Sequence, residues 1–401
     1  MKNLLEERKE EEQNDNNKAF DSKPKTLWSE AWKRLKRDKL ALLGGAIVLI
    51  MIIVATFARQ IAPFDPNVQF NNGTTAYGMP LPLDTHSKKI VATRKDTSKE
   101  FTVKSSIIFT DKNGGITFRT VGNTRVKSGM DKIEFPVSAI SLKEAKAPSG
   151  VEMTTNDKIS KYFDSMTLVN DKYFVLGTDP SGRDSLSRLI WGSQVSLKVG
   201  ILAIGVATII GVIFGLISGY FGGWTDLVIM RFTDVMMSMP DLLLVMALVS
   251  VIPSKGDQSS QGIGIIIFSI GIVTWTGIAR MVRSQVFTVK EMEYVEAAKA
   301  AGSKDPRILF FHLMPNVIAP VIVIGTMSIA GAIMTEAALS FLGFGVKPPT
   351  SSWGSMVNEG LGFFRDAPWV PIIPGAAIAI AVFAFNLFGD GVRDAIDPKL
   401  K

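Results

Sequence analysis

The stretch Leu40–Ala62 reads LALLGGAIVLIMIIVATFARQIA and contains a single charged residue, Arg59. A helix of about 20 apolar residues is long enough to cross the hydrocarbon core of a bilayer. The composition of the whole chain agrees, because 47% of its 401 residues are hydrophobic and its mean hydropathy is +0.24, which is unusual for a soluble globule. We therefore expect an integral membrane protein whose first spanning helix covers residues 39–62.

The residues in front of this helix set its expected direction. Five basic residues lie immediately before the apolar run: Lys33, Arg34, Lys36, Arg37 and Lys39. Positively charged residues next to a spanning helix stay in the cytoplasm, so residues 1–38 are expected to form a cytoplasmic tail. The net charge of +7 follows from such clusters beside apolar runs, and no nucleic-acid partner is expected.

Residues 63–175 differ from the helix before them in composition. Lys, Asp, Thr, Ser and Asn dominate this segment, and no apolar run in it is long enough to span a membrane. Alternating apolar residues lie on either side of the pair Asn113-Gly114, at Phe101, Val103, Ile116 and Phe118. Asn-Gly is preferred in tight hairpin turns, which need positive φ. The sequence therefore predicts a β-rich extracellular insertion domain with at least one hairpin.

Five further apolar runs follow the insertion domain: 195–219, 227–252, 263–284, 316–342 and 371–389. With the first helix they make about six spans, so the expected fold class is an all-α integral membrane protein with a five-helix core at residues 195–390. Alternation of the spans places residues 391–401 in a cytoplasmic C-terminal tail and residues 176–194 in an outer-face segment. In that segment, Ser181 and Asp184 have the spacing of a capping box that starts a helix.

Small residues in the second span recur at a spacing that allows close helix contact. Gly211, Gly215 and Gly219 lie four residues apart, and glycines on one face of a helix let a second backbone approach. We interpret this pattern as ordinary helix packing.

Acidic residues inside the apolar runs are candidates for the translocation path. Asp234 and Asp241 interrupt the third span, and Glu336 lies in the fifth. A charged group at the bilayer centre costs roughly 2.5–3.5 kcal/mol, so such residues face protein or water. The alternative for the aspartates is a position near the cytoplasmic interface, solvated or paired with Arg231, three residues before Asp234. The same two interpretations apply to Glu336.

The sequence VEAAKAAGSKDPRILFFHLMPNVIAP, residues 295–320, begins in a cytoplasmic loop and leads into the fifth span. Its first half is rich in strong helix formers, Gly302 provides a helix stop, and Pro315 begins the next span. Ala297 and Ala298 leave one face of the short helix without bulk, while Glu296 is available for contacts at the rim. Such a rigid knob suits a groove on a partner protein.

This segment resembles the EAA loop of ABC importer permeases, with Glu296-Ala297-Ala298, Gly302 and His312-Leu313-Met314-Pro315-Asn316 in matching positions. The resemblance implies that the cytoplasmic loop 285–315 contains a coupling helix that docks into a cleft of a separate ATPase subunit. The residues to which it assigns ATPase coupling are Glu296, Ala297, Ala298, Gly302, His312 and Pro315.

Four further stretches resemble the C-type permease subunit of oligopeptide and dipeptide importers: AWKRLKRDKLALLGG (31–45), LGTDPSGRDSLSRLIWGSQVSL (176–197), EAALSFLGFG (336–345) and GDGVRDAIDPKL (389–400). The resemblance covers residues 28–66 and 176–400 and leaves out the insertion domain. It implies a peptide importer of the bacterial plasma membrane, in which this chain forms half of the translocation pathway. Its implied partners are a homologous B-type permease, two ATP-binding subunits, and a peptide-binding protein that is periplasmic or lipid-anchored outside the cell. Nickel or another small solute is the alternative cargo.

Several reaction classes are disfavoured by what the sequence lacks. It contains no cysteine, and His86 and His312 lie far apart, so we assign no catalytic and no metal-binding residues. No G-x-x-x-x-G-K-[ST] motif occurs, so ATP and Mg²⁺ are expected on the partner ATPase, with no cofactor and no enzyme activity on this chain. The alternative class is an ion-coupled secondary transporter, which internal repeats would favour. For the insertion domain we hypothesise that it receives the binding protein or braces the partner permease, against an insertion with no role in transport.

Overall fold

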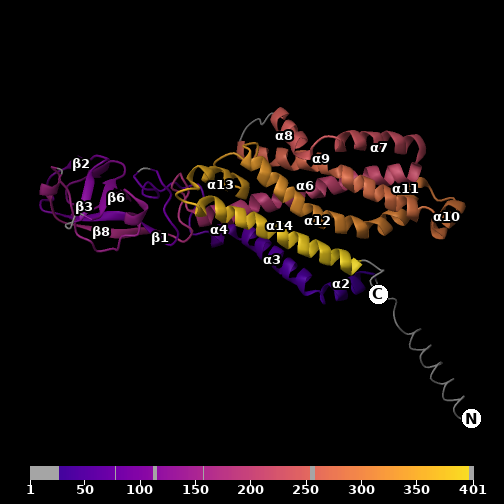
Figure 1. Ribbon diagram of the computed structural model, residues 1–401, viewed down its shortest axis with the longest axis horizontal. Coiled ribbons are helices and arrows are strands. Elements are labelled where there is room, and N and C mark those ends of the chain that lie inside the picture. The colour runs from indigo at the N-terminus through magenta and orange to yellow at the C-terminus, as the bar shows by residue number, and fades with distance from the viewer. Residues whose placement is uncertain (1–26, 77, 112–114, 157, 253–257, 397–401) are drawn as a thin grey trace, which may run out of the picture.

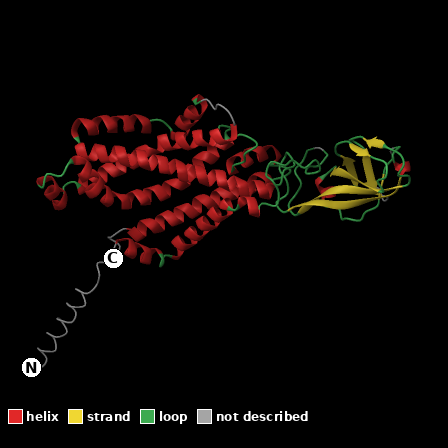
Figure 2. Cartoon of the chain, turned by 180° about the vertical axis from the view of Figure 1, so that it is seen from behind, coloured by secondary structure: helices red, strands yellow, loops and turns green. Residues whose placement is uncertain are grey.

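The computed structural model describes residues 27–76, 78–111, 115–156, 158–252 and 258–396. Figure 1 shows an elongated molecule with a bundle of long helices and, beyond one end of it, a small β domain. The loops that connect these two parts are seen from behind in Figure 2. The opposite end of the bundle contains α10 (Glu293–Ala300). We call the two ends of the bundle the β-domain end and the α10 end.

The bundle consists of long apolar helices with short helices between them. The longer helices are α3 (Lys39–Thr56), α6 (Ser185–Phe221), α7 (Gly223–Met237), α8 (Asp241–Val251), α9 (Gln258–Val289), α12 (Met314–Phe341) and α14 (Trp369–Ile396). The short ones are α2 (Leu27–Leu35), α4 (Ala58–Ile61), α11 (Asp305–Arg307), the π-helical turn η2 (Ile308–Leu313), α13 (Trp353–Gly360) and the 3-10 turn η3 (Leu361–Phe363).

The expected helical membrane fold is confirmed. Within the described residues, five helical segments are long and apolar enough to cross a membrane, and α7 with α8 makes a sixth if this pair, bent by 92°, is one span. The bend follows from Pro240, which is the N-cap of α8 and cannot donate the hydrogen bond that a continuous helix needs.

α6 and α9 pack closely because glycines line their contact. A Cβ on Gly211 would lie 2.8 Å from the Cβ of Ile278, and one on Gly215 would lie 2.6 Å from the Cβ of Val282. Gly219 approaches α9 in the same way. Only a residue without a side chain permits such an approach. The interpretation of the four-residue glycine spacing as helix packing is therefore confirmed.

The start of α6 differs from the expectation. Asp184 is its N-cap, and the carboxylate accepts a hydrogen bond from the N–H of Ser187 at 2.7 Å. Burial raises the pKa of the Asp184 carboxyl, and the bonds from Ser187 lower it in part. Ser181 instead lies in the preceding loop, where its N–H donates to Asp179. The prediction that Ser181 starts a helix is wrong, and the second half of the expected outer-face segment forms the first turns of α6.

The β-rich insertion is confirmed as an antiparallel six-stranded sheet in the order β7-β3-β4-β6-β1-β8, beside a separate two-stranded sheet of β2 and β5. The strands are β1 (Thr85–Arg94), β2 (Phe101–Val103), β3 (Ile108–Asp111), β4 (Thr117–Thr120), β5 (Thr124–Val126), β6 (Lys132–Ala139), β7 (Met153–Thr154) and β8 (Phe163–Phe174), with the short helical turns α5 (Leu142–Ala145) and η1 (Ser160–Tyr162). Phe109, Phe118, Phe135 and Phe174 are fully buried in its core.

The predicted hairpin exists, with a different first strand. β3 pairs with β4 in antiparallel register, with Phe109 opposite Phe118. The Asn113-Gly114 turn itself lies outside the described residues. Phe101 and Val103 belong to β2, which pairs with β5 and not with β4. The alternating apolar residues do belong to β-strands. However, they come from two nested strand pairs, β2 with β5 and β3 with β4, and not from a single hairpin.

Candidate functional site

The segment that resembles an EAA loop, residues 285–315, lies at the α10 end of the bundle (Figure 1) and is called the EAA loop below. α10 has acidic residues in its first turn and Lys299 in its last, an order that the helix dipole favours. Val295 is fully buried and packs into the hydrophobic core between α6, α9 and α12. Glu296 and Ala297 are exposed, and Ala298 is half-buried. The helix is thus held by one apolar residue and leaves its small side chains at the surface.

Gly302 ends α10 in a Schellman motif. The N–H of Ser303 donates to the C=O of Ala298 at 3.0 Å, and the N–H of Gly302 donates to the C=O of Lys299 at 2.9 Å. Gly302 has a φ of +77°, a conformation that favours glycine because an L side chain is strained there. The residue therefore stops the helix by the mechanism that its sequence position suggests.

His312 and Pro315 lie where η2 passes into α12. The backbone C=O of His312 accepts a hydrogen bond from Nδ2 of Asn316 at 2.7 Å. A hollow of about 470 Å³ adjoins this turn and is lined by Pro306, Arg307, Phe310, Phe311 and His312. Phe310 is 59% exposed and Phe311 75% exposed. Large apolar side chains that remain exposed beside a hollow are typical of a protein contact surface.

Tyr220, near the end of α6, makes two contacts with the EAA loop. The hydroxyl of Tyr220 donates to Oδ1 of Asp305 at 2.6 Å. The ammonium group of Lys299 lies 5.6 Å from the centre of the Tyr220 ring, within the range of a cation–π interaction. Neither contact was predicted, because no motif relates Tyr220 to residues so far along the chain.

Asp234, a pathway candidate, forms an ion pair between α7 and α9. Nη2 of Arg280 lies 2.8 Å from Oδ1 of Asp234, and the two side chains are 49% and 51% exposed. The suggested pairing with Arg231 is wrong, because the neighbouring helix supplies the partner. Arg283 of α9 makes a second, bidentate ion pair with Asp226 of α7. α7 is therefore fixed to α9 by two charge pairs.

Asp241 and Glu336 occupy contrasting surroundings. Asp241 is exposed in the first turn of α8. Glu336 is fully buried, and its carboxyl accepts hydrogen bonds from Oγ of Ser340 at 2.7 Å and from Oγ of Ser196 on α6 at 3.0 Å. A buried carboxyl with these partners connects α12 to α6. Within the described residues, no hydrogen bond or ion pair joins the three acidic candidates to one another.

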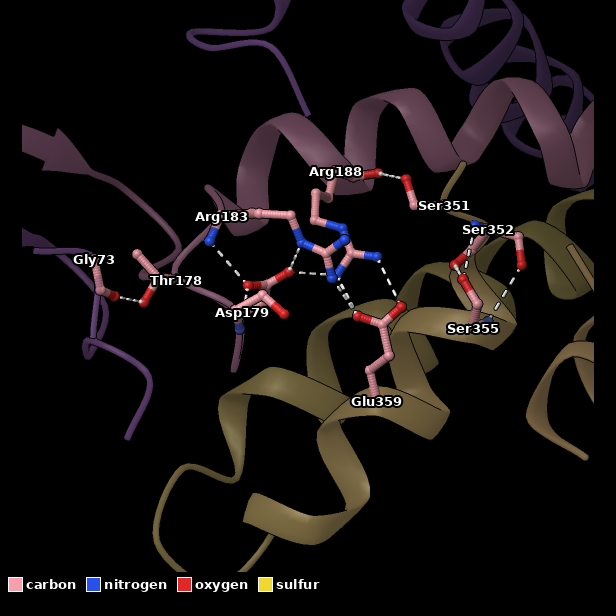
Figure 3. A network of polar contacts seen from close by, with 10 residues as sticks. Gly73, Thr178, Asp179, Arg183, Arg188, Ser351, Ser352, Ser355 and Glu359 are labelled. Carbon is pink, nitrogen blue, oxygen red and sulfur yellow. Dashed lines mark hydrogen bonds and ion pairs between the residues drawn. The ribbon is translucent and has the colours of Figure 1, made fainter. Parts of the chain in front are cut away.

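A network that sequence reasoning missed lies at the β-domain end. Figure 3 shows Asp179, Arg183, Arg188 and Glu359 converging. Nη1 of Arg188 lies 2.6 Å from Asp179 and 2.8 Å from Glu359, and Arg183 approaches the same two carboxylates at 2.5 and 2.6 Å. Arg188 is 1% exposed and Asp179 2%. The four-residue spacing of Asp179 and Arg183 was visible in the sequence, but nothing in it pointed to Glu359.

The described part of the chain shows no arrangement suited to a metal. Among these residues, no group of three or more Asp, Glu or His side chains is placed to hold a metal ion.

Two family models match the chain. Residues 211–401 match the binding-protein-dependent transport system inner membrane component. Residues 26–80 match the N-terminal TM domain of oligopeptide transport permease C. The two matches lie on either side of most of the β domain.

Similar proteins include permeases of several transport systems. The dipeptide transport system permease protein DppC of Alkalihalophilus pseudofirmus is 41% identical over 225 residues, which is 56% of this chain and 72% of that protein. The oligopeptide transport system permease protein OppC of Bacillus subtilis is 42% identical over 225 residues, with the same shares covered. The glutathione transport system permease protein GsiD of Escherichia coli is 31% identical over 377 residues, which is 94% of this chain and 92% of that protein.

Among solved structures, the inward-facing MetNI methionine ABC transporter matches with a TM-score of 0.41 and 17% identity, over 52% of this chain and 96% of that one. The sequence relatives are much closer than this structure. From its identity to these relatives and the share of each that is covered, the chain belongs to the family of binding-protein-dependent transport system inner membrane components.

Proposed function

We propose that this chain is the C-type permease subunit of an ATP-binding-cassette importer for peptides, and that it forms half of the translocation pathway. Relatives that are 41% and 42% identical are named for dipeptide and oligopeptide transport, which supports peptides over nickel or another small solute as cargo. The chain itself needs no cofactor for this role, because ATP and Mg²⁺ bind the partner ATPase.

One observation supports the proposal most strongly: the exposed surface at the α10 end. Ala297 on α10 and the phenylalanines of the adjoining hollow lie on elements that pack against each other. A short helix with small side chains, next to an apolar hollow, can fit into a rigid groove on a partner protein. The binding energy of a protein–protein interface of this kind depends on a few anchoring residues. We assign this surface, with Glu296, Ala298, Gly302, His312 and Pro315, to docking of the ATPase.

The arrangement of the elements supports a topology in which the α10 end is cytoplasmic. α2, with its basic residues, packs against α14. In Figure 1, α2 and the C-terminal end of α14 lie away from the β domain, toward the α10 end. Basic residues next to spans stay inside, so both termini would be cytoplasmic and the β domain extracellular. The complete transporter would then add a B-type permease, two ATP-binding subunits, and a peptide-binding protein that is periplasmic or lipid-anchored.

For the translocation path we propose Asp234 together with its partner Arg280. Charged groups within membrane-spanning helices face water or protein and avoid lipid, because lipid exposure is costly. Both side chains are about half exposed in the isolated chain, which fits a position at an aqueous path. Exposed Asp241 remains a second candidate. Buried Glu336, with its serine partners, fits a structural role better.

Affinity purification of the tagged chain in mild detergent tests the proposal. We expect an ATPase with a phosphate-binding loop and a second permease to copurify. Ala297→Trp adds bulk on the exposed face of α10, so it should remove the ATPase and retain the second permease. The matched control is Ile108→Trp at an exposed position of β3, which should retain both partners.

The opposite result is equally clear. A chain that purifies alone, or as a homo-oligomer that transports without ATP, contradicts the importer assignment and favours an ion-coupled carrier. The cargo is tested separately, by competition between labelled dipeptides and Ni²⁺ in ATP-driven uptake. If Ni²⁺ competes and peptides do not, the chain would still be an importer permease, but its cargo would be nickel and not peptides.

A further inference from the structure

The ion-pair network at the β-domain end joins three parts of the chain. Asp179 and Arg183 belong to the loop between β8 and α6, Arg188 to the start of α6, and Glu359 to α13 (Figure 3). We call these four residues the junction. Each arginine contacts both carboxylates, so two positive charges are matched by two negative ones.

The loop between β8 and α6 also contacts residues 70–81, which precede β1 and which we call the base of the β domain. Oγ1 of Thr178 accepts a hydrogen bond from the N–H of Leu81 at 2.8 Å and donates to the C=O of Gly73. The C=O of Gly182 accepts a hydrogen bond from the N–H of Phe70 at 3.1 Å. A Cβ on Gly73 would lie 2.4 Å from that carbonyl oxygen. Backbones this close leave no room for the loop and the base of the β domain to shift against each other.

α13 is attached to α6 near both of its ends. At its first residue, Nε1 of Trp353 donates to the C=O of Leu189 at 3.0 Å. Near its last, the carboxylate of Glu359 accepts hydrogen bonds from Nη1 and Nη2 of Arg188 at 2.8 and 3.0 Å, and from Arg183 at 2.6 Å. The bond to Arg183 links α13 to the same loop that holds the β domain.

We infer that the junction fixes the orientation of the β domain relative to α13, and that Glu359 is the positioning residue of this unit. Bidentate arginine–carboxylate pairs set relative orientation as well as distance. A buried ion pair also resists partial opening, because a charge left without its partner is costly. The fixed orientation matters for transport only if the proposed function holds. A binding protein that docks at the β-domain end would then meet the β domain and α13 as one pre-arranged surface, which lowers the entropic cost of docking.

The orientation can be measured directly, because the chain contains no cysteine. Spin labels are introduced by Ile108→Cys on β3 and Phe364→Cys just after η3, both exposed positions, in the full chain in lipid nanodiscs. With the native junction we expect a narrow distance distribution. We expect Glu359→Gln to broaden it and Glu359→Asp, which keeps the charge, to broaden it less. The matched control is Glu134→Gln, which removes a surface ion pair with Lys89 inside the β domain and leaves the width unchanged.

An unchanged distance distribution in Glu359→Gln overturns the inference. If that variant does not insert, the double variant Arg183→Gln/Glu359→Gln replaces it, because it removes one charge of each sign and keeps the pair between Arg188 and Asp179. The double variant is also expected to broaden the distribution, and a narrow one overturns the inference.

Uptake kinetics separate a positioning role from a general loss of stability. In proteoliposomes with the copurified partners, we expect Glu359→Gln to raise the half-saturating concentration of the copurified binding protein roughly tenfold, equal to 1.4 kcal/mol of docking free energy. The maximum rate per inserted transporter should change little. A lower maximum rate at an unchanged half-saturating concentration overturns the docking role. Failure of the proposed function is distinguishable, since then the native chain shows no uptake that depends on ATP and binding protein, whatever the spin labels report.

Discussion

Replacement of Gly302 by alanine tests whether α10 must end in its left-handed turn. Gly302 has a φ of +77°, and a residue with a side chain costs roughly 1–2 kcal/mol in this region. No heavy atom lies within 4 Å of the position that a Cβ would take, so no steric clash adds to the cost. A free-energy change of this size alters a conformational population by roughly 5–30-fold. We expect the ATP-driven uptake rate of Gly302→Ala to fall by a factor in this range.

Two further substitutions give the expected order. Gly302→Asn should lose less activity, because asparagine adopts the left-handed conformation more readily than alanine. Gly302→Asp should lose more activity than Gly302→Asn, because a carboxylate at the C-terminal end of a helix adds roughly 0.3–1 kcal/mol of unfavourable interaction with the dipole.

The assay is the initial rate of ATP-driven peptide uptake into proteoliposomes, normalised to the amount of inserted chain. The matched control is Gly205→Ala in α6, where a Cβ also has nothing within 4 Å and alanine favours the helix. Native uptake by Gly302→Ala would refute the reasoning, because the coupling surface would then tolerate a strained or rebuilt helix end.

Three other perturbations follow from the geometry. Gly215→Ala places a methyl group 2.6 Å from the Cβ of Val282, and we expect this overpacking to lower the free energy of unfolding by roughly 1–3 kcal/mol, seen as a lower melting temperature in detergent; an unchanged melting temperature contradicts the tight packing. Asp234→Cys should react quickly with a charged, membrane-impermeant thiol reagent, while Ile209→Cys, an exposed position in the apolar part of α6, should not; equal reaction rates would remove Asp234 from the aqueous path. Burial lowers the pKa of Lys88 from 10.5, so between the folded pKa and 10.5 the unfolded chain binds more protons and the stability of the β domain should rise with pH. Lys88→Met should abolish this rise in a comparison of thermal unfolding at neutral and alkaline pH, and an identical rise in the variant would count against the buried position.

Hydropathy predicted the spanning helices well and their ends poorly. Four of the predicted apolar runs coincide with α6, α9, α12 and α14, because lipid selects for apolar side chains along the span. The run 40–62 is instead divided between α3 and α4, and the run 227–252 between α7 and α8. The start of α6 escaped detection because Ser185, Ser187 and Arg188 are polar, although all three are buried. A hydropathy profile treats a polar residue as solvent-exposed and cannot recognise one whose partners lie elsewhere in the chain.

In the candidate site, too, contacts between residues close in sequence could be predicted, and contacts between distant residues could not. The helix stop at Gly302 was predictable because a Schellman motif involves residues within one turn of each other. The pair between Asp234 and Arg280, the contact between Tyr220 and Asp305, and the bonds of Glu359 all join residues far apart in sequence. A single sequence contains no signal for such pairings, since each depends on how the helices pack.

α6 continues without a break from Ser185 to Phe221, a length of about 55 Å at 1.5 Å per residue. One end begins beside the junction, and at the other Tyr220 contacts Asp305 of the EAA loop. A helix without an internal hinge acts as a lever, so a tilt of about 5° displaces one end by about 5 Å relative to the other over this length. We therefore expect movement of the EAA loop during the ATP cycle to be transmitted along α6 as a rigid-body displacement. A fluorophore on the β domain would then report, from the far side of the membrane, on events at the ATPase.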